Sequence, residues 1–126
     1  MFETTKKISP LAEKPCVPCL EGGSRVQGED LSRLVAELGG EWEAAQDTRL
    51  EKEFQFNNFR TALDFADQVG ALAEQINHHP DLTVSWGRTK VVIWTHKIGG
   101  LSETDFIFAA KTDALYLKAK ETAPAD

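Results

Sequence analysis

The chain has 126 residues, 41% of them hydrophobic, and a formal net charge of −6, so it is long enough for one core without a metal or disulfide. The acidic balance argues against a nucleic-acid-binding surface, because such surfaces cluster Lys and Arg. No apolar run approaches the roughly 20 residues that span a bilayer, and no signal-peptide core follows the first lysines, so we expect a cytoplasmic protein with no membrane partner.

Residues 1–28 are rich in Pro, Gly, Glu and Lys and show no apolar periodicity, which predicts a mobile or loosely packed leader. The only two cysteines, Cys16 and Cys19, lie in it with the spacing of half a zinc site, but the sequence offers no second pair. We interpret the pair as structurally quiet. A redox pair, a metal shared between subunits and adventitious binding are the alternatives.

Apolar residues then recur at helical spacing and stop at a Gly-Gly pair, which predicts a short amphipathic helix. They are Leu31, Leu34, Val35 and Leu38. A period-two pattern on both sides of a turn near Asp47 and Thr48 predicts a β-hairpin. From Phe59 to Ile76 the apolar spacing is helical again, and this stripe predicts the longest helix of the chain.

A second hairpin is predicted between residues 82 and 96, where Gly87 and Arg88 supply the turn. Ser102 has the position of a helix N-cap, with Asp105 at the third helical position, and we expect the last helix to run to about Lys118. Residues 121–126 are expected to fray.

This order predicts an α+β domain over residues 29–120, with helix, two strands, helix, two strands and helix in sequence. We expect a mostly antiparallel four-stranded sheet with the three helices packed on one face. Exposed strand edges predict association into a homo-oligomer, without fixing its symmetry.

All three histidines lie in two short segments, residues 77–81 and residues 95–105. Histidine has an unperturbed pKa of about 6.5, so this placement suggests acid/base chemistry near neutral pH. Pro80 disfavours a helical conformation for His79, so the long helix should end at or just before His79, where the helix dipole stabilises an imidazolium. Glu74, four residues before His78, is placed to pair with the His78 ring.

His96 arrives from the end of a predicted strand, just ahead of Gly99 and Gly100, whose backbone can approach a flat molecule closely. The neighbouring His78 and His79 point different ways, so we expect them to contact different parts of one ligand. Three imidazoles that converge from two elements suit a polar heterocycle.

Between Leu31 and Tyr116 the sequence resembles the pterin-4a-carbinolamine dehydratases, also called 4a-hydroxytetrahydrobiopterin dehydratases. The resemblance rests on the aromatic string at residues 54–59, the His-His-Pro-acid string at 78–81, Thr95-His96, and the Gly-Leu-Ser turn followed by Asp105. It implies the fold above, a homodimer or homotetramer, and the loss of water from a 4a-hydroxytetrahydropterin to give the quinonoid dihydropterin. This reaction recycles the pterin cofactor of aromatic amino acid hydroxylases. The pterin is then the substrate, and no further cofactor or metal is expected.

The elimination that the resemblance implies needs one acid and one base. We assign proton transfer to His78 and His96, and the holding of the pterin to His79, although these roles are interchangeable on the sequence alone. Other residues match family positions that line or support the pterin pocket. They are Asn77, Pro80, Thr95 and Lys97 for the lining, and Glu74 and Asp105 for the acidic support.

Alternatives exist for several of these residues. Three imidazoles with a water form a known catalytic zinc arrangement, although adjacent histidines make it awkward. Asp105 could serve only to cap a helix, and Glu74 could be an ordinary solvated residue. Tryptophans at strand spacing are more often core or interface residues, and Trp86 is the one tryptophan that we consider for substrate contact. The alternative function is a non-catalytic protein-binding module that acts as a regulatory or assembly partner, but three convergent imidazoles favour catalysis.

Overall fold

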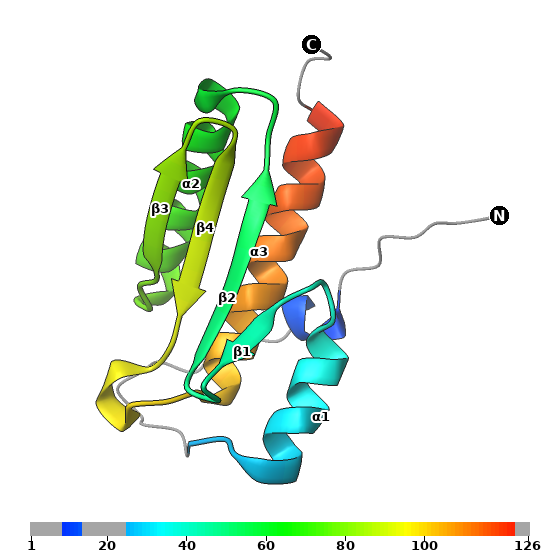
Figure 1. Cartoon of the computed structure of the whole chain (residues 1–126), viewed down its shortest axis with the longest axis vertical. Coiled ribbons are helices and arrows are strands. Elements are labelled where there is room, and N and C mark those ends of the chain that lie inside the picture. Colours follow the sequence, from blue (N-terminus) through cyan, green and yellow to red (C-terminus); the bar gives the residue numbers. More distant parts are fainter. Residues whose placement is uncertain (1–8, 14–24, 123–126) are drawn as a thin grey trace, which may run out of the picture.

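The computed structural model describes residues 9–13 and 25–122 of the chain. Within this part the chain forms a single four-stranded sheet with three α-helices and short 3-10 turns (Figure 1). The elements are η1 (Pro10–Glu13), α1 (Gly28–Leu38), β1 (Glu43–Ala45), β2 (Arg49–Gln55), α2 (Phe59–Ile76), β3 (Asp81–Ser85), β4 (Arg88–Ile93), η3 (His96–Ile98) and α3 (Glu103–Thr122). The predicted α+β class and element order are confirmed. None of the described helices is both long and apolar enough to cross a membrane.

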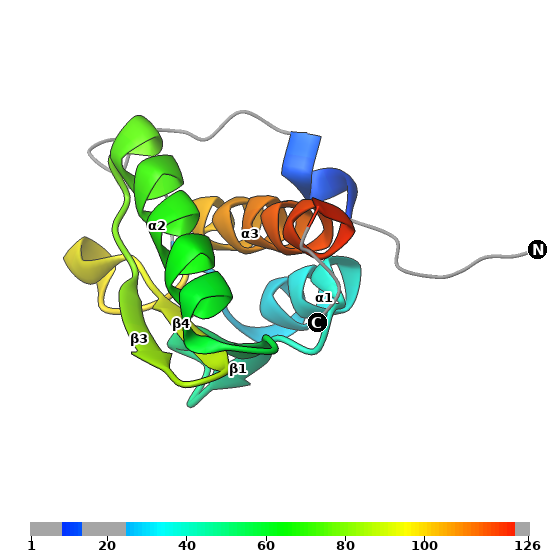
Figure 2. The ribbon, with the colours of Figure 1, turned by 90° about the horizontal axis from the view of Figure 1, so that it is seen from above.

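The strands form one antiparallel sheet in the order β1-β2-β4-β3, so β1 and β3 are its edges. Figure 2 shows α1, α2 and α3 on the same side of this sheet, with α3 between the other two, which confirms the prediction of helices on one face. Side chains alternate between the two faces of a strand. Leu50 and Ile93 pair across β2 and β4 and are fully buried under the helices. Positions 49 and 94 therefore belong to the face that carries no helix.

The central helix of the core is α3. Its consecutive residues from Phe106 to Ala110 are each at most 2% exposed, so this part of the helix is enclosed on every side. The sheet, α2, α1 and η1 all contact it. Farther along α3, the Tyr116 ring lies 4.9 Å from that of Phe54 on β2, and Phe54 lies equally close to Phe65 of α2. This aromatic cluster joins the sheet to both helices.

One segment of the predicted leader is part of the folded domain. Pro10–Glu13 forms η1, and Leu11 is completely buried against α3. The carbonyl oxygen of Ala12 accepts a hydrogen bond from Lys111 Nζ at 2.7 Å. The expectation of loose packing is wrong for these residues, because a single buried leucine produces no periodicity in the sequence. Cys16 and Cys19 lie outside the described residues.

The ends of the domain also extend slightly past the predicted limits of 29–120. Helix α1 begins at Gly28, and α3 continues to Thr122, beyond its expected end near Lys118. Residues 123–126 lie outside the described part. The predicted ends of the other helices agree closely with the structure, since α1 ends before Gly39 and α2 ends before the paired histidines.

A partly buried ion pair attaches the first hairpin to α3. The Asp113 carboxylate accepts hydrogen bonds from Lys52 Nζ at 2.8 Å and from the Trp42 indole N–H at 3.0 Å. Burial raises the pKa of the Asp113 carboxyl, and the opposing effects of Lys52 and Trp42 do not cancel this increase. The absence of a side chain at Gly40 leaves room for the Asp113 carboxylate, because a Cβ at this position would lie 2.7 Å from one of its oxygens.

We predict that Asp113→Asn removes a pH-dependent part of the stability. With its raised pKa, the folded Asp113 holds its proton more tightly than the unfolded chain does, so its contribution is present at low pH. That contribution is lost as the pH rises from the ordinary value of 3.8 through the folded pKa. Urea unfolding of both proteins from about pH 4 to pH 8 should show the stability of the wild type falling relative to that of the variant.

Asp64→Asn is the matched control, because Asp64 is an exposed carboxylate of α2 that pairs with Arg60 on the surface. The difference between the wild type and this control should stay nearly constant over the same pH range. A constant difference for Asp113→Asn as well would contradict the raised pKa.

Candidate active site

The end of α2 and the end of β4 meet around one pocket of about 230 Å³. All three histidines of the chain line it, so the two sequence segments that contain them come together in the fold. The lining residues are Asn77, His78, His79, Trp94, His96 and Lys97.

A left-handed turn at Asn77 ends α2 and separates the two neighbouring histidines. Asn77 has φ 56° and ψ 46°, a conformation that asparagine tolerates better than most residues. Its backbone N–H and that of His78 both bond to the carbonyl oxygen of Ala73. The chain direction changes here, and as a result the His78 side chain is only 4% exposed whereas that of His79 is 54% exposed.

The His78 ring is held by a carboxylate inside the protein. Its Nε2 lies 2.6 Å from Oδ1 of Asp105, which is completely buried. An ionised carboxylate only accepts hydrogen bonds, so the hydrogen between the two groups belongs to His78 Nε2.

The second oxygen of Asp105 is also fully engaged. Oδ2 accepts from the Thr95 hydroxyl at 2.8 Å and from the backbone N–H of Ser102 at 2.8 Å. The Thr95 and Ser102 hydroxyls are 2.9 Å apart and share a further hydrogen bond. The Ser102 contact is the carboxylate half of a capping box at the start of α3. Asp105 therefore both caps a helix and supports a histidine, which unites the two roles that the sequence offered as alternatives.

The predicted pairing of Glu74 with His78 is wrong. Glu74 Oε2 instead lies 2.7 Å from His79 Nε2. The prediction assumed that helical geometry continues to His78, whereas the turn at Asn77 directs His78 away from the helix surface. Since Glu74 is 78% exposed, this surface pair adds little to stability. Glu74, His79 and Pro80 also line an adjoining groove between α2 and β3, so Pro80 lies beside the pocket and not in its wall.

His96 is arranged differently from the other two histidines. Its ring stacks on the Trp94 indole, with ring centroids 4.3 Å apart and an angle of 29° between the planes. Within the described residues, no hydrogen bond or ion pair to the His96 ring is found. Trp94 is not among the site residues that the sequence predicts, although the alternation of strand side chains places residues 94 and 96 on the same side.

Trp86 is not among the residues that line the pocket. Trp86 lies in the turn between β3 and β4, at the opposite end of that hairpin from the pocket, and is 73% exposed. The remaining predicted residues lie in or under the pocket, with Lys97 in the wall and Thr95 buried. In the described part of the chain, no group of three or more His, Cys, Asp or Glu side chains is arranged to hold a metal ion.

We predict that Asp105→Asn destabilises the fold by about 3 kcal/mol. The amide has a single acceptor oxygen, whereas His78, Thr95 and Ser102 present donors on both sides of Asp105, so at least one buried donor loses its partner. Urea unfolding at neutral pH measures the loss. Glu74→Gln is the control and should change stability by less than about 0.5 kcal/mol. Equal losses of unfolding free energy in both variants would contradict the stabilising role assigned to the hydrogen bonds of Asp105.

The chain is similar to several known proteins. The family profile described as pterin 4 alpha carbinolamine dehydratase matches residues 24–115. A protein of Rubrobacter xylanophilus, provisionally named pterin-4-alpha-carbinolamine dehydratase, is 53% identical over 108 residues, which cover 86% of this chain and 100% of the relative. A protein of Alkaliphilus metalliredigens with the same provisional name is 48% identical over 84% of this chain and 96% of its own. The crystal structure of a transcriptional coactivator/pterin dehydratase from Brucella melitensis has a TM-score of 0.68 and 28% identity, over 74% of this chain and 99% of that one.

Proposed function

The chain belongs to the pterin 4 alpha carbinolamine dehydratase family, and on this basis we propose that it removes water from a 4a-hydroxytetrahydropterin to give the quinonoid dihydropterin. The observation that carries the proposal is the pocket that His78, His79 and His96 line together. Its volume of about 230 Å³ suits part of a bicyclic ring. Histidine is also the side chain best suited to give and accept protons at neutral pH.

The reaction balances with proton transfers alone. The bond between C4a and its hydroxyl oxygen breaks, and the leaving hydroxide takes a proton from an acid to become water. A base removes the hydrogen on N5, and the electron pair of that N–H bond forms the new double bond between N5 and C4a. One imidazolium and one imidazole on the two reacting positions are sufficient, and each is worth about 10² to 10⁴-fold in rate.

Within this proposal, His78 and His96 transfer the protons. Asp105 fixes the orientation of the His78 ring through the contact with its Nε2. His96 reaches the same pocket from the end of β4. His79, which is half exposed at the rim and bonded to Glu74, contacts the pterin without transferring a proton.

The physiological setting is part of the proposal. An aromatic amino acid hydroxylase produces the 4a-hydroxypterin, and dehydration returns the pterin to its reductive cycle, in the cytoplasm. We further propose a homodimer or homotetramer, because the edge strands β1 and β3 each leave one row of backbone groups unpaired within the sheet.

Alanine substitution of each histidine tests the assignment. We predict that His78→Ala and His96→Ala each lower kcat by about 10² to 10⁴-fold, because a general acid or base is lost. His79→Ala should mainly raise KM, since it removes a binding contact. The measurement is the disappearance of the 4a-hydroxypterin, formed in the assay, relative to its spontaneous decay. Asp64→Ala, at the other end of α2, is the control and should keep full activity. Full activity in all three histidine variants would overturn the proposal.

A protein-binding role is the second candidate. The Brucella structure is described as both a transcriptional coactivator and a pterin dehydratase, and its fold is similar to this one. If the wild-type chain shows no acceleration over spontaneous decay, and a purified partner still binds after all three histidines are replaced by alanine, the binding module is the better description. Turnover that depends on the histidines favours the dehydratase.

A further inference from the structure

Of the three imidazoles in the pocket, His96 is the one whose ring has no hydrogen-bonding partner among the described residues. Asp105 holds the His78 ring at 2.6 Å, and Glu74 holds the His79 ring at 2.7 Å. An exposed side chain without such a bond can change rotamer in picoseconds to nanoseconds. A group that transfers protons must stay close to its productive orientation. Another contact therefore has to hold His96.

Within the described residues, the aromatic ring that the His96 ring contacts is that of Trp94. The separation of 4.3 Å and the angle of 29° correspond to offset stacking. The backbone on both sides of Trp94 is fixed. Ile93 pairs with Leu50 in the sheet, and Thr95 exchanges backbone hydrogen bonds with Gly100. The indole is therefore a rigid surface on which the imidazole can lie.

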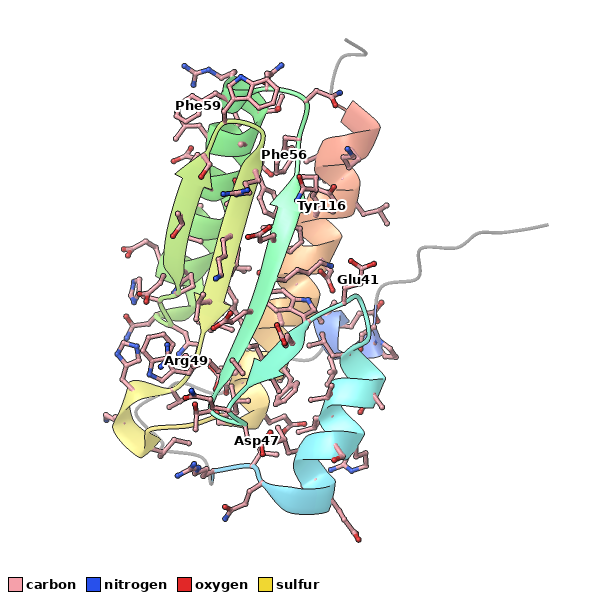
Figure 3. All side chains as sticks on the ribbon, in the orientation of Figure 1. Glu41, Asp47, Arg49, Phe56, Phe59 and Tyr116 are labelled. Carbon is pink, nitrogen blue, oxygen red and sulfur yellow. The ribbon has the colours of Figure 1, made fainter. Side chains whose placement is uncertain are left out.

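Arg49 holds the indole from the neighbouring strand. Since Leu50 pairs with Ile93, Arg49 lies next to Trp94 on the helix-free face of the sheet. The guanidinium carbon is 5.3 Å from the centroid of the Trp94 ring, which is within the range of a cation–π contact. No ion pair to Arg49 is found in the described part of the chain. Figure 3 shows Arg49 at the pocket end of the sheet, far from Phe56, Phe59 and Tyr116 at the other end.

We propose that Trp94 is a positioning residue that orients the His96 ring for proton transfer, and that Arg49 supports it by fixing the indole. The proposal rests on the proposed dehydration for its kinetic consequence, but the orientation of the ring is measurable without any turnover. Trp94 acts here through His96. A tryptophan that instead served as a stacking surface for the pterin would affect substrate binding and not the rate of the bound complex.

The kinetic test compares Trp94→Leu, Trp94→Phe and the matched control Trp86→Leu, which removes an exposed tryptophan at the far end of the β3–β4 hairpin. Trp94→Leu should lower kcat by about 10- to 100-fold, because a misplaced catalytic group loses the rate gained from orientation. KM should change little. Trp94→Phe keeps an aromatic face and should restore most of the activity, and Trp86→Leu should match the wild type. Thermal unfolding of Trp94→Leu and Trp94→Phe shows whether both variants are folded.

Proton NMR of the histidine rings supplies the readout that needs no substrate. The indole face shields protons stacked on it, so the ring protons of His96, assigned with a His96→Gln variant, should resonate upfield of those of His79. Trp94→Leu should move them downfield, and Trp86→Leu should leave them in place. Arg49→Met should lower kcat by no more than about fivefold, the equivalent of one exposed cation–π contact, while Arg49→Lys keeps the charge and should lose less.

Three results would overturn the proposal: ring protons of His96 that do not respond to Trp94→Leu, unchanged kcat in a folded Trp94→Leu variant, or an increase confined to KM. If the wild type itself has no dehydratase activity, the proposed function fails. The NMR comparison still decides in that case whether Trp94 orients His96.

Discussion

The carboxylate of Asp105 joins the start of α3 and the end of the β4 segment to a histidine that lies 27 residues earlier in the chain. One oxygen accepts from His78 after α2, and the other accepts from Thr95 after β4 and from the backbone of Ser102 before α3. The carboxylate is completely buried, so its charge-assisted hydrogen bonds form where water cannot compete for them and where an unpaired charge would be costly. Both walls of the pocket are consequently fixed by the same anion, and neither can shift without breaking one of its bonds.

The side chains of the three residues that follow β4 alternate in direction, and their roles differ accordingly. Thr95 points inward to Asp105, whereas Trp94 and His96 belong to the other side and line the pocket. The two histidines proposed to transfer protons are therefore oriented by different kinds of interaction. His78 is buried and bonded to a carboxylate, and His96 is exposed and stacked on an indole. Both arrangements depend on the position of Thr95. The turn that follows brings Gly100 back to Thr95, and the backbone hydrogen bonds between these two residues hold Thr95 in place.

Periodicity in the sequence was sufficient for the sheet and for α1 and α2, because each of these elements buries a regular set of side chains. Helix α3 is enclosed on every side and shows no such period, and the N-cap pattern at Ser102 and Asp105 predicted it instead. The placement of all three histidines in two short segments indicated where the pocket lies. Periodicity did not predict the partner of Glu74, because Asn77 could have continued the helix or turned left-handed, and only the turn separates His78 from the helix surface. Trp94 stands in a run of β-forming residues that marks no single member as special. Leu11 contacts the core from a segment without any pattern.

The turn at Asn77 also creates a gradient of chemical accessibility among three otherwise identical side chains. A reagent that modifies imidazoles from solution meets His79 and His96 at the surface, whereas it reaches the 4% exposed side chain of His78 only through the pocket. Labelling would therefore proceed in two kinetic phases, and local opening around Asp105 would accelerate the slower one. The labelling rate of His78 thus measures local fluctuation of the site without any ligand.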